Sequence, residues 1–338
     1  MDLRGHDYIA TQDWRLSELQ HLIDRAGELK RLFKAGEPHR LLPDKTIFLF
    51  FLDKSTRTRN SFEAGATQLG AHAHFIDAST SQMAHGESPK DMGIILSSYG
   101  HGIAIRHDLV PGEGNTLMRA VAEHASVPVI TMQCDVDHPC QTLADLMTLQ
   151  ELRGRDLRGL RLAVSWAYAP SYAKPVSVPQ GLLTLMPRFG VDVILAHPPG
   201  YELMPDQVEI AVANAAAAGT RLEFTDTMDA AFENADVVYP KSWGALNYFG
   251  NPDEGLALAA GHRDWICDER RMGLTKGGEA LYMHCLPADI GDEVSPGVMS
   301  KYRVEVAREA NKKVYVIMAL LAAAKSDDLK GRLAALLG

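Results

Sequence analysis

The chain has 338 residues, 46% of them hydrophobic and 23% charged, with a formal net charge of -9. This length allows two domains of ordinary size, and the composition is that of a globular protein. The negative charge disfavours nucleic acid as a partner, and no apolar run approaches the ~20 residues that a membrane span needs. The four cysteines show no CxxC pair, and the start of the chain lacks the apolar core of a signal peptide. We therefore expect a cytoplasmic protein without disulfides.

The first half of the chain alternates predicted helices with predicted strands. An apolar stripe predicts a helix over 17–35, with Ser17 and Gln20 at the spacing of a capping box. Apolar runs predict buried strands, and periodic segments predict helices between them. The strands are expected over 46–52, 71–76, 102–105 and 127–132, and helices over 91–99, 115–125 and 139–152.

A polar turn with the sequence Ser-Thr-Arg-Thr-Arg, residues 55–59, separates the strand 46–52 from a helix. Ser55 and Thr56 stand where an N-cap belongs. The free N–H groups of the helix start, the hydroxyls and Arg57 would meet at one point. This convergence predicts an anion site, most naturally for phosphate. The alternative is a capped surface helix with a solvated basic turn.

Two further features of the first half are candidates for ligand contact. The long polar loop 77–89 contains Gln82 and His85 and has no core to bury, so it is either a surface loop or a segment with a function. Arg106 stands at the C-terminal end of the strand 102–105, where parallel sheets bind ligands. The alternative for Arg106 is a salt bridge at the rim of the sheet.

Two Cys, two Asp and one His are close together in the segment 134–141. Pro139 at a helix start explains this sequence without a metal, and no second ligand pair stands at zinc spacing, so no metal site is predicted. His138, Gln141 and Asp145 fall on one helix face. Asp145 is expected to orient its neighbours within the first domain.

The charged segment 153–159 contains two glycines and predicts a domain boundary. Beyond it, strands are expected over 162–166, 191–196, 222–225 and 237–239, with helices over 179–189, 206–218 and 227–234, and a closing helix over 309–325. This alternation predicts a parallel sheet with helices on both faces, and hence an α/β fold. No GxGxxG motif follows the strand 162–166, which disfavours a nucleotide-binding oxidoreductase.

Three motifs together resemble the aspartate and ornithine carbamoyltransferases: the turn 55–59, His-Pro-Cys-Gln at 138–141, and His-Cys-Leu-Pro at 284–287. They occur in the order of that family, and the resemblance runs over nearly the whole chain. It implies two Rossmann-like domains, residues 1–152 with 309–338 and residues 153–308. It also implies no cofactor, and a homotrimer with shared active sites in which the loop 77–89 reaches the neighbouring subunit.

The resemblance implies a role toward carbamoyl phosphate for each matching residue. Ser55, Thr56, Arg57 and Thr58 would hold the phosphate, Arg106 the phosphate and the carbonyl, and Gln82 a substrate oxygen. His138 would donate to the carbonyl oxygen, Gln141 would bind the carbamoyl nitrogen, and the backbone at Cys285 and Leu286 would accept from the carbamoyl NH2. The catalytic residues would be Arg57, Arg106, His138 and Cys285. Lys313 stands where ornithine enzymes have an arginine, so a bidentate contact becomes a single one.

The second half departs from the ornithine enzymes at two places. The proline-rich segment 166–179 replaces their Gly-Asp and Asn-Asn pattern, and Tyr-Pro-Lys-Ser-Trp-Gly at 239–244 replaces their Ser-Met-Gly motif. Both replacements resemble the knotted carbamoyltransferases, which include N-acetylornithine and N-succinylornithine enzymes and a branch of unsettled acceptor. This resemblance implies a trefoil knot in the second domain. The candidate acceptor-binding residues are His85, Trp166, Tyr168, Lys174, Lys241, Trp243 and Asp289.

Asp289 favours the branch of unsettled acceptor. The acetylornithine enzyme carries basic residues after Leu-Pro, whereas Asp289 would repel the carboxylate of an acylornithine placed in the same way. We therefore expect carbamoyl transfer between carbamoyl phosphate and an amino or ureido acceptor other than ornithine. The alternatives are an N-acetylornithine or N-succinylornithine carbamoyltransferase, and a non-catalytic protein that binds carbamoyl phosphate.

Overall fold

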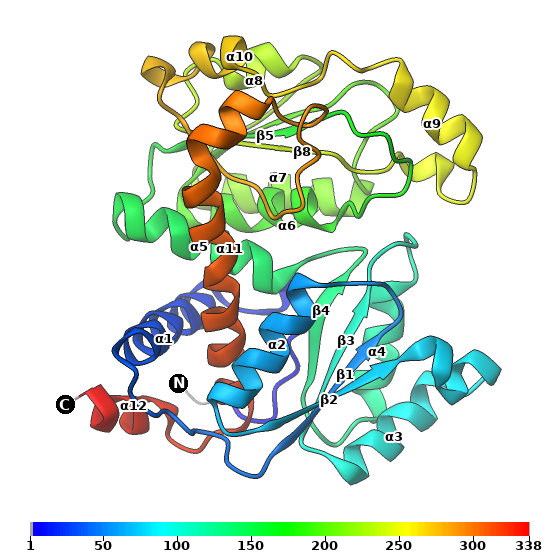
Figure 1. Ribbon diagram of the computed structural model, residues 1–338, viewed down its shortest axis with the longest axis vertical. Coiled ribbons are helices and arrows are strands. Elements are labelled where there is room, and N and C mark those ends of the chain that lie inside the picture. The colour runs from blue at the N-terminus through cyan, green and yellow to red at the C-terminus, as the bar shows by residue number, and fades with distance from the viewer. Residues whose placement is uncertain (1–2, 338) are drawn as a thin grey trace. The chain divides into compact units, whose positions relative to one another are not determined.

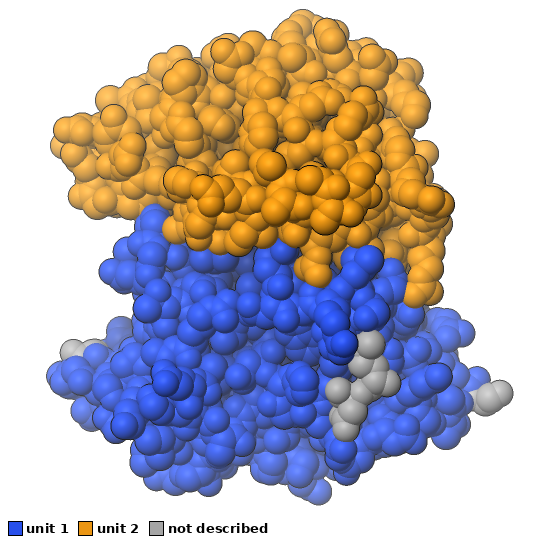
Figure 2. All heavy atoms as spheres, turned by 180° about the vertical axis from the view of Figure 1, so that it is seen from behind, with its two compact units in different colours: residues 1–143, 311–338 blue, residues 144–310 orange. Residues whose placement is uncertain are grey.

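A computed structural model describes residues 3–337 of the chain. Contacts divide it into two compact units, residues 1–143 with 311–338 and residues 144–310, which Figure 2 shows in two colours. The divisions fall inside two helices, α5 (Pro139–Arg153) and α11 (Pro296–Lys325). No helix among the described residues is long and apolar enough to cross a membrane.

Unit 1 is built on a four-stranded parallel sheet in the order β2-β1-β3-β4 (Figure 1). The strands are β1 (Thr46–Phe51), β2 (His72–Asp77), β3 (Gly102–His107) and β4 (Val129–Cys134). β3 and β4 are buried along their whole length, whereas the edge strand β2 is only partly covered. The chain leaves β1 toward β2 and later returns to β3 on the other side of β1. Ligands of parallel sheets bind at such a switch point, at the carboxyl ends of the strands.

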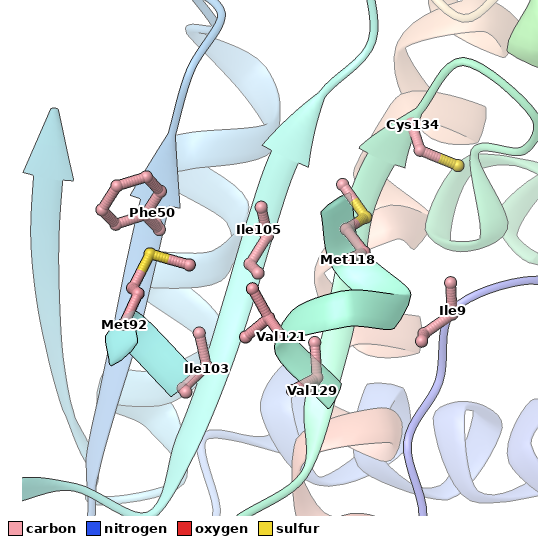
Figure 3. Packing of buried hydrophobic residues seen from close by; sticks show 9 residues of the cluster. All are labelled: Ile9, Phe50, Met92, Ile103, Ile105, Met118, Val121, Val129 and Cys134. Atoms are coloured by element: carbon pink, nitrogen blue, oxygen red, sulfur yellow. The ribbon is translucent and has the colours of Figure 1, made fainter. Parts of the chain in front are cut away.

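Helices cover both faces of this sheet. Figure 3 shows the face under α3 (Pro89–Tyr99) and α4 (Gly114–His124), where Met92 and Met118 pack on Phe50, Ile105 and their neighbours. Because β2 and β3 lie on opposite sides of β1 and such crossovers are right-handed as a rule, α2 (Arg57–Gln68) belongs on the opposite face. There a Cβ built on Gly65 of α2 would lie 3.3 Å from the Ile317 side chain of α11, so a glycine allows this close approach. The remaining helices of unit 1 are η1 (Thr11–Asp13), α1 (Leu16–Ala35), η2 (Ala78–Thr80), η3 (Gln82–His85) and α12 (Leu329–Leu337).

The helix α1 begins earlier than its capping signal predicts. The capping box uses Arg15 and Glu18, and the Arg15 amide donates to a Glu18 carboxylate oxygen at 2.8 Å. The predicted pair Ser17 and Gln20 is therefore wrong, because both residues lie within the helix. Glu18 at the third helical position supplies one of the two bonds of a capping box, and the Arg15 side chain, which has no acceptor, cannot supply the other.

Unit 2 carries a five-stranded parallel sheet in the order β7-β6-β5-β8-β9. The strands are β5 (Arg161–Trp166), β6 (Asp192–Ala196), β7 (Leu222–Thr225), β8 (Val237–Lys241) and β9 (Leu281–Tyr282). The switch point of this sheet lies between β5 and β8. Its helices are α6 (Ser177–Leu185), η4 (Met186–Phe189), α7 (Pro205–Ala218), α8 (Met228–Phe232), η5 (Leu246–Tyr248), α9 (Pro252–Ala260), α10 (Glu269–Leu274) and η6 (Lys276–Gly278). The two parallel sheets flanked by helices confirm the predicted α/β class.

Candidate active site

The turn 55–59 leads directly into α2, which begins at Arg57 with Thr56 as its N-cap. Thr56 therefore stands at the predicted N-cap position, and its side chain makes no capping hydrogen bond. Thr58 is buried, while Ser55 is half-buried and Thr56 and Arg57 are exposed. A helix start whose N–H groups are not closed by the N-cap side chain can accept an anion there.

Arg106 lies at the C-terminal end of β3, the strand beside β1, and is 9% exposed. Its Nη1 donates to Gln133 Oε1 at 2.6 Å, and its Nη2 donates to Asp108 Oδ2 at 2.8 Å. Both acceptors are buried, so the guanidinium is held at the switch point of the sheet. Sequence reasoning missed Gln133 and Asp108, because only the register between β3 and β4 brings Gln133 beside Arg106.

Asp53 ties the loop after β1 to the end of β3. Its Oδ2 accepts from the Asp108 amide at 2.7 Å and the Leu109 amide at 3.3 Å, and lies 3.1 Å from His107 Nδ1. Glu113 lies 3.3 Å from the other ring nitrogen of His107. The hydrogen bond with Asp53 raises the pKa of His107, and burial opposes this rise. This network ties the backbone just before the turn 55–59 to the residues that follow Arg106.

His107→Asn is expected to remove a pH-dependent share of the stability of unit 1. A histidine whose folded pKa is raised above its ordinary 6.5 stabilises fully below that value and loses its effect as the pH rises through the folded pKa. The wild type should exceed the variant by about 1 kcal/mol in acid and converge with it in alkali. Urea unfolding of both proteins at about pH 5.5 and about pH 9 measures this difference. A difference that is the same at both pH values would contradict the assignment.

His138, Gln141 and Lys313 lie together in unit 1, at the start of α5 and within α11, and all three are buried. The ammonium of Lys313 donates to His138 Nε2 at 3.4 Å, so neutral His138 carries its proton on Nδ1. Burial raises the pKa of Cys134 and of Cys140 to about 12, which keeps both as thiols. Among residues 3–337, no group of three or more His, Cys, Asp or Glu is arranged to hold a metal ion.

The loop 77–89 folds into the short helices η2 and η3 and carries two predicted site residues. Gln82 and His85 are both exposed in unit 1. The Ser81 hydroxyl caps η3 by accepting from the Met83 amide at 3.3 Å. The loop is therefore locally structured, and its two polar side chains face solvent in the single chain.

In unit 2 four of the predicted acceptor residues lie at or just after the ends of β5 and β8. Trp166 and Trp243 are each 1% exposed, and both indole N–H groups bond within the unit, Trp166 Nε1 to Trp243 O at 3.0 Å and Trp243 Nε1 to Tyr201 O at 2.9 Å. Lys241 Nζ donates to the carbonyls of Pro175 and Ser242 at 3.1 and 2.7 Å. Tyr168 is buried, with the Arg263 guanidinium 5.3 Å above its ring.

Lys174 and Asp289 form an ion pair in unit 2. Lys174 Nζ lies 2.5 Å from Asp289 Oδ2, and the two side chains are 21% and 35% exposed. The proline-rich segment and the turn after Leu-Pro are therefore joined by two residues that the sequence had suggested separately for the acceptor.

The His-Cys-Leu-Pro motif turns sharply after β9. Leu286 adopts a φ of 57°, and its amide donates to His284 Nδ1 at 2.9 Å. The His284 amide donates to Glu309 Oε2 at 3.1 Å. A non-glycine residue in the left-handed region is a strained conformation that clusters at functional sites. Cys285, between these two bonds, is buried.

Asp145 is fully buried and falls in unit 2, because the division between the units lies inside α5, just before it. It interacts there with the buried Glu309. Its expected role of orienting neighbours within the first domain stays a prediction.

Comparison with known proteins identifies the family. The model of the carbamoyl-phosphate-binding domain of aspartate/ornithine carbamoyltransferases matches residues 6–151, and that of the Asp/Orn-binding domain matches residues 175–324. YgeW of Escherichia coli (strain K12), named as a carbamoyltransferase without a stated acceptor, is 40% identical over 96% of this chain and 90% of its own. The N-acetylornithine carbamoyltransferase of Xylella fastidiosa (strain Temecula1) is 34% identical over 95% of this chain and 98% of its own.

A solved structure shows the same fold. A mutant of N-acetyl-L-ornithine transcarbamylase, complexed with carbamyl phosphate and N-succinyl-L-norvaline, superposes with a TM-score of 0.85. It is 33% identical and covers 94% of this chain and 99% of its own. Both domain models and these relatives span nearly the whole sequence, so the chain belongs to the aspartate/ornithine carbamoyltransferase family.

Proposed function

We propose that this carbamoyltransferase binds carbamoyl phosphate in unit 1 and transfers the carbamoyl group to an amino or ureido acceptor other than ornithine. One observation carries the donor site: Arg106 is fixed by Gln133 and Asp108 at the switch point where the turn 55–59 enters α2. A guanidinium, several hydroxyls and a helix start suit a dianionic acyl phosphate.

The proposed chemistry needs no covalent enzyme intermediate. A neutral amine or amide nitrogen attacks the carbonyl carbon, the bond from that carbon to the phosphate oxygen breaks, and phosphate leaves with the electron pair. Ser55, Thr56, Arg57 and Thr58 would stabilise the charge that grows on phosphate, while Arg106 and His138 polarise the carbonyl oxygen. A phosphate oxygen takes the proton from nitrogen, so no side-chain base is required.

Gln141, Lys313 and Gln82 stay proposed contacts to carbamoyl phosphate, as do the backbone groups at Cys285 and Leu286. The burial of Gln141 and Lys313 beside His138 supports a common role for the three. The exposure of Gln82 and His85 supports our proposal of a homotrimer in which this loop serves a neighbouring site. The trefoil knot and the cytoplasmic location also stay proposals from the sequence resemblance.

The acceptor proposal rests on Lys174 and Asp289. Lys174 could bind the carboxylate of an acylornithine, but its ammonium is already paired with Asp289. An acceptor with a positive charge or several N–H groups could use Asp289 directly, whereas a carboxylate would have to displace it. His85, Tyr168 and Lys241 stay proposed acceptor contacts. The burial of Trp166 and Trp243 favours a supporting place for both indoles behind the acceptor.

Asp289→Asn is expected to shift the acceptor preference toward carboxylates. The substitution removes the negative charge that neutralises Lys174, so the Kd for N-acetylornithine or N-succinylornithine should fall, by about tenfold for one charge-assisted hydrogen bond. Calorimetry with both acylornithines measures this change. Asp292→Asn, a change of the same kind three residues on, serves as the matched control. An unchanged Kd in Asp289→Asn would remove the reason for excluding acylornithines.

Phosphate release from carbamoyl phosphate, tested against a panel of acceptors, decides the function. The panel contains ornithine, N-acetylornithine, N-succinylornithine, aspartate and putrescine, with ureido compounds and phosphate for the reverse direction. Turnover with an amine or ureido compound other than ornithine and the two acylornithines supports the proposal. Turnover with an acylornithine would establish the alternative function. Binding of carbamoyl phosphate without turnover of any compound would favour a non-catalytic binding protein.

A further inference from the structure

We propose that Glu293 is a positioning residue for acceptor recognition, because its single carboxylate holds three acceptor-facing segments of unit 2 in one arrangement. This inference rests on the proposed function. The three segments are the proline-rich stretch with Lys174, the residues that follow β8, and the turn after the Leu-Pro sequence. Glu293 itself is not expected to touch the acceptor.

The two carboxylate oxygens of Glu293 contact all three segments. Oε1 accepts from the Ser242 amide at 2.6 Å and lies 3.4 Å from Lys174 Nζ. Oε2 accepts from the Asp289 amide at 2.7 Å and lies 3.6 Å from His284 Nε2. Short bonds from two backbone amides fix the direction of both segments more closely than side-chain contacts would.

The backbone of Glu293 is itself anchored in the unit. Its amide donates to the Asp289 carbonyl at 2.8 Å, and its carbonyl accepts from the Cys267 amide at 3.0 Å. The neighbouring Val294 forms bridges with Cys267 and Ile290. The carboxylate therefore extends from a fixed point, which lets it impose a position on its partners.

The charge of Glu293 is retained although the residue is 1% exposed. Burial raises its pKa. His284, Lys174 and the Asp289 amide together lower it by more than that, so the pKa falls to about 2. An ionised carboxylate accepts from both amides at once and also attracts the Lys174 ammonium. A neutral side chain of the same size could do only part of this.

Lys174 contacts Asp289 and Glu293 together. The carboxylate therefore sets both the position of the acceptor-facing turn and the charge that an acceptor meets there. Sequence reasoning missed Glu293, because an acidic residue in the stretch Gly-Asp-Glu at 291–293 reads as an exposed turn. The hydrogen bonds that single it out come from residues 51 and 4 positions away.

Glu293→Gln tests this inference with little change in volume. The glutamine has one acceptor oxygen, so one of the two amides must face an NH2 group and lose its bond. Glu279→Gln is the matched control, because Glu279 is 76% exposed and lies 3.4 Å from Lys301. Hydrogen exchange by mass spectrometry should accelerate about tenfold or more in peptides covering 172–176, 241–245 and 288–292. Peptides covering β6 and β7 should keep their wild-type rates.

Binding and kinetics give the second readout. Calorimetry with carbamoyl phosphate alone should give a Kd within about twofold of wild type. For any acceptor that the wild type carbamoylates, KM should rise about tenfold or more. Accelerated exchange across all of unit 2, unchanged exchange in the three segments, or an equal loss of carbamoyl phosphate affinity would each overturn the inference. If the wild type turns over no acceptor, the proposed function fails, and the exchange pattern alone still decides whether Glu293 holds the segments.

Discussion

Replacing Arg106 with methionine is expected to reduce carbamoyl transfer about 100- to 1,000-fold and to destabilise unit 1 by about 3 to 5 kcal/mol. The rate falls because the guanidinium is the fixed cation at the end of β3, where charge would develop on the carbonyl and phosphate oxygens. The stability falls because the Asp108 side chain, fully buried, loses the guanidinium that balances its charge. Phosphate release assays and urea unfolding measure the two effects.

The two effects of Arg106→Met can be separated with a second substitution. In Arg106→Met/Asp108→Asn the uncompensated buried charge is gone, so most of the stability should return while the rate stays low. Arg106→Lys keeps a cation near Asp108 but cannot donate to Asp108 and Gln133 as a planar fork, so it should be more stable than methionine and still slow.

Arg119→Met is the control for a surface ion pair. Arg119 is 49% exposed and lies 3.0 Å from Asp13, so its loss should cost at most about 1 kcal/mol and leave the rate unchanged. Recovery of both stability and rate in the Arg106→Met/Asp108→Asn variant would show that Arg106 acts only through folding.

The sequence predicts the fold well where each element carries its own signal. β1 and β5 are near-continuous apolar runs, and the alternation of strands and helices requires parallel sheets. The helices α9 and α10 were not predicted, because α9 is mostly small residues and half of α10 is charged, so neither shows a distinct apolar periodicity. The closing helix begins at Pro296 rather than near 309, and the prediction missed the apolar side chains of Val298, Met299 and Val306 that its first turns bury.

The residues of the candidate site likewise differ in whether the sequence alone indicates them. Ser55, Arg57 and Arg106 could be found from the sequence, because their positions at a helix start and a strand end have a direct chemical meaning. Gln133 and Glu293 could not, because their roles depend on strand register and on hydrogen bonds across the sheet edge. Lys174 and Asp289 were each suggested for the acceptor, yet their pairing with one another needs the folded loops.

The buried pair Asp145 and Glu309 gives unit 2 an expected dependence on pH. Burial raises the pKa of Glu309 well above its ordinary 4.5, and the neighbouring Asp145 raises it further. Glu309 also accepts from the His284 amide, so the pair lies beneath the His-Cys-Leu-Pro turn. Two interacting buried carboxyl groups hold one proton between them, which one group donates to the other.

Glu309→Gln is therefore expected to be more stable than wild type at high pH, by about 2 to 3 kcal/mol. A carboxyl group whose folded pKa is raised binds more protons in the folded state, so its stabilisation is complete below 4.5 and is lost as the pH rises toward the folded pKa. Glutamine keeps an oxygen for the His284 amide and offers an NH2 to Asp145, and it cannot lose a proton. The stability of the variant should lack the decline that the wild type shows.

Urea unfolding followed by tryptophan fluorescence measures this, since Trp166, Trp243 and Trp265 all lie in unit 2. The variant and the wild type should differ little at about pH 5 and most at about pH 9. Glu309→Ala is the contrast, because it removes the acceptor of the His284 amide and leaves a cavity, so it should be destabilised at both pH values. A glutamine variant that parallels the wild type across this range would mean that Asp145 and Glu309 are both charged in the folded protein. The strained Leu286 turn would then lie near two negative charges, the carboxylates of Asp145 and Glu309. Its position would depend on cations that balance these two charges.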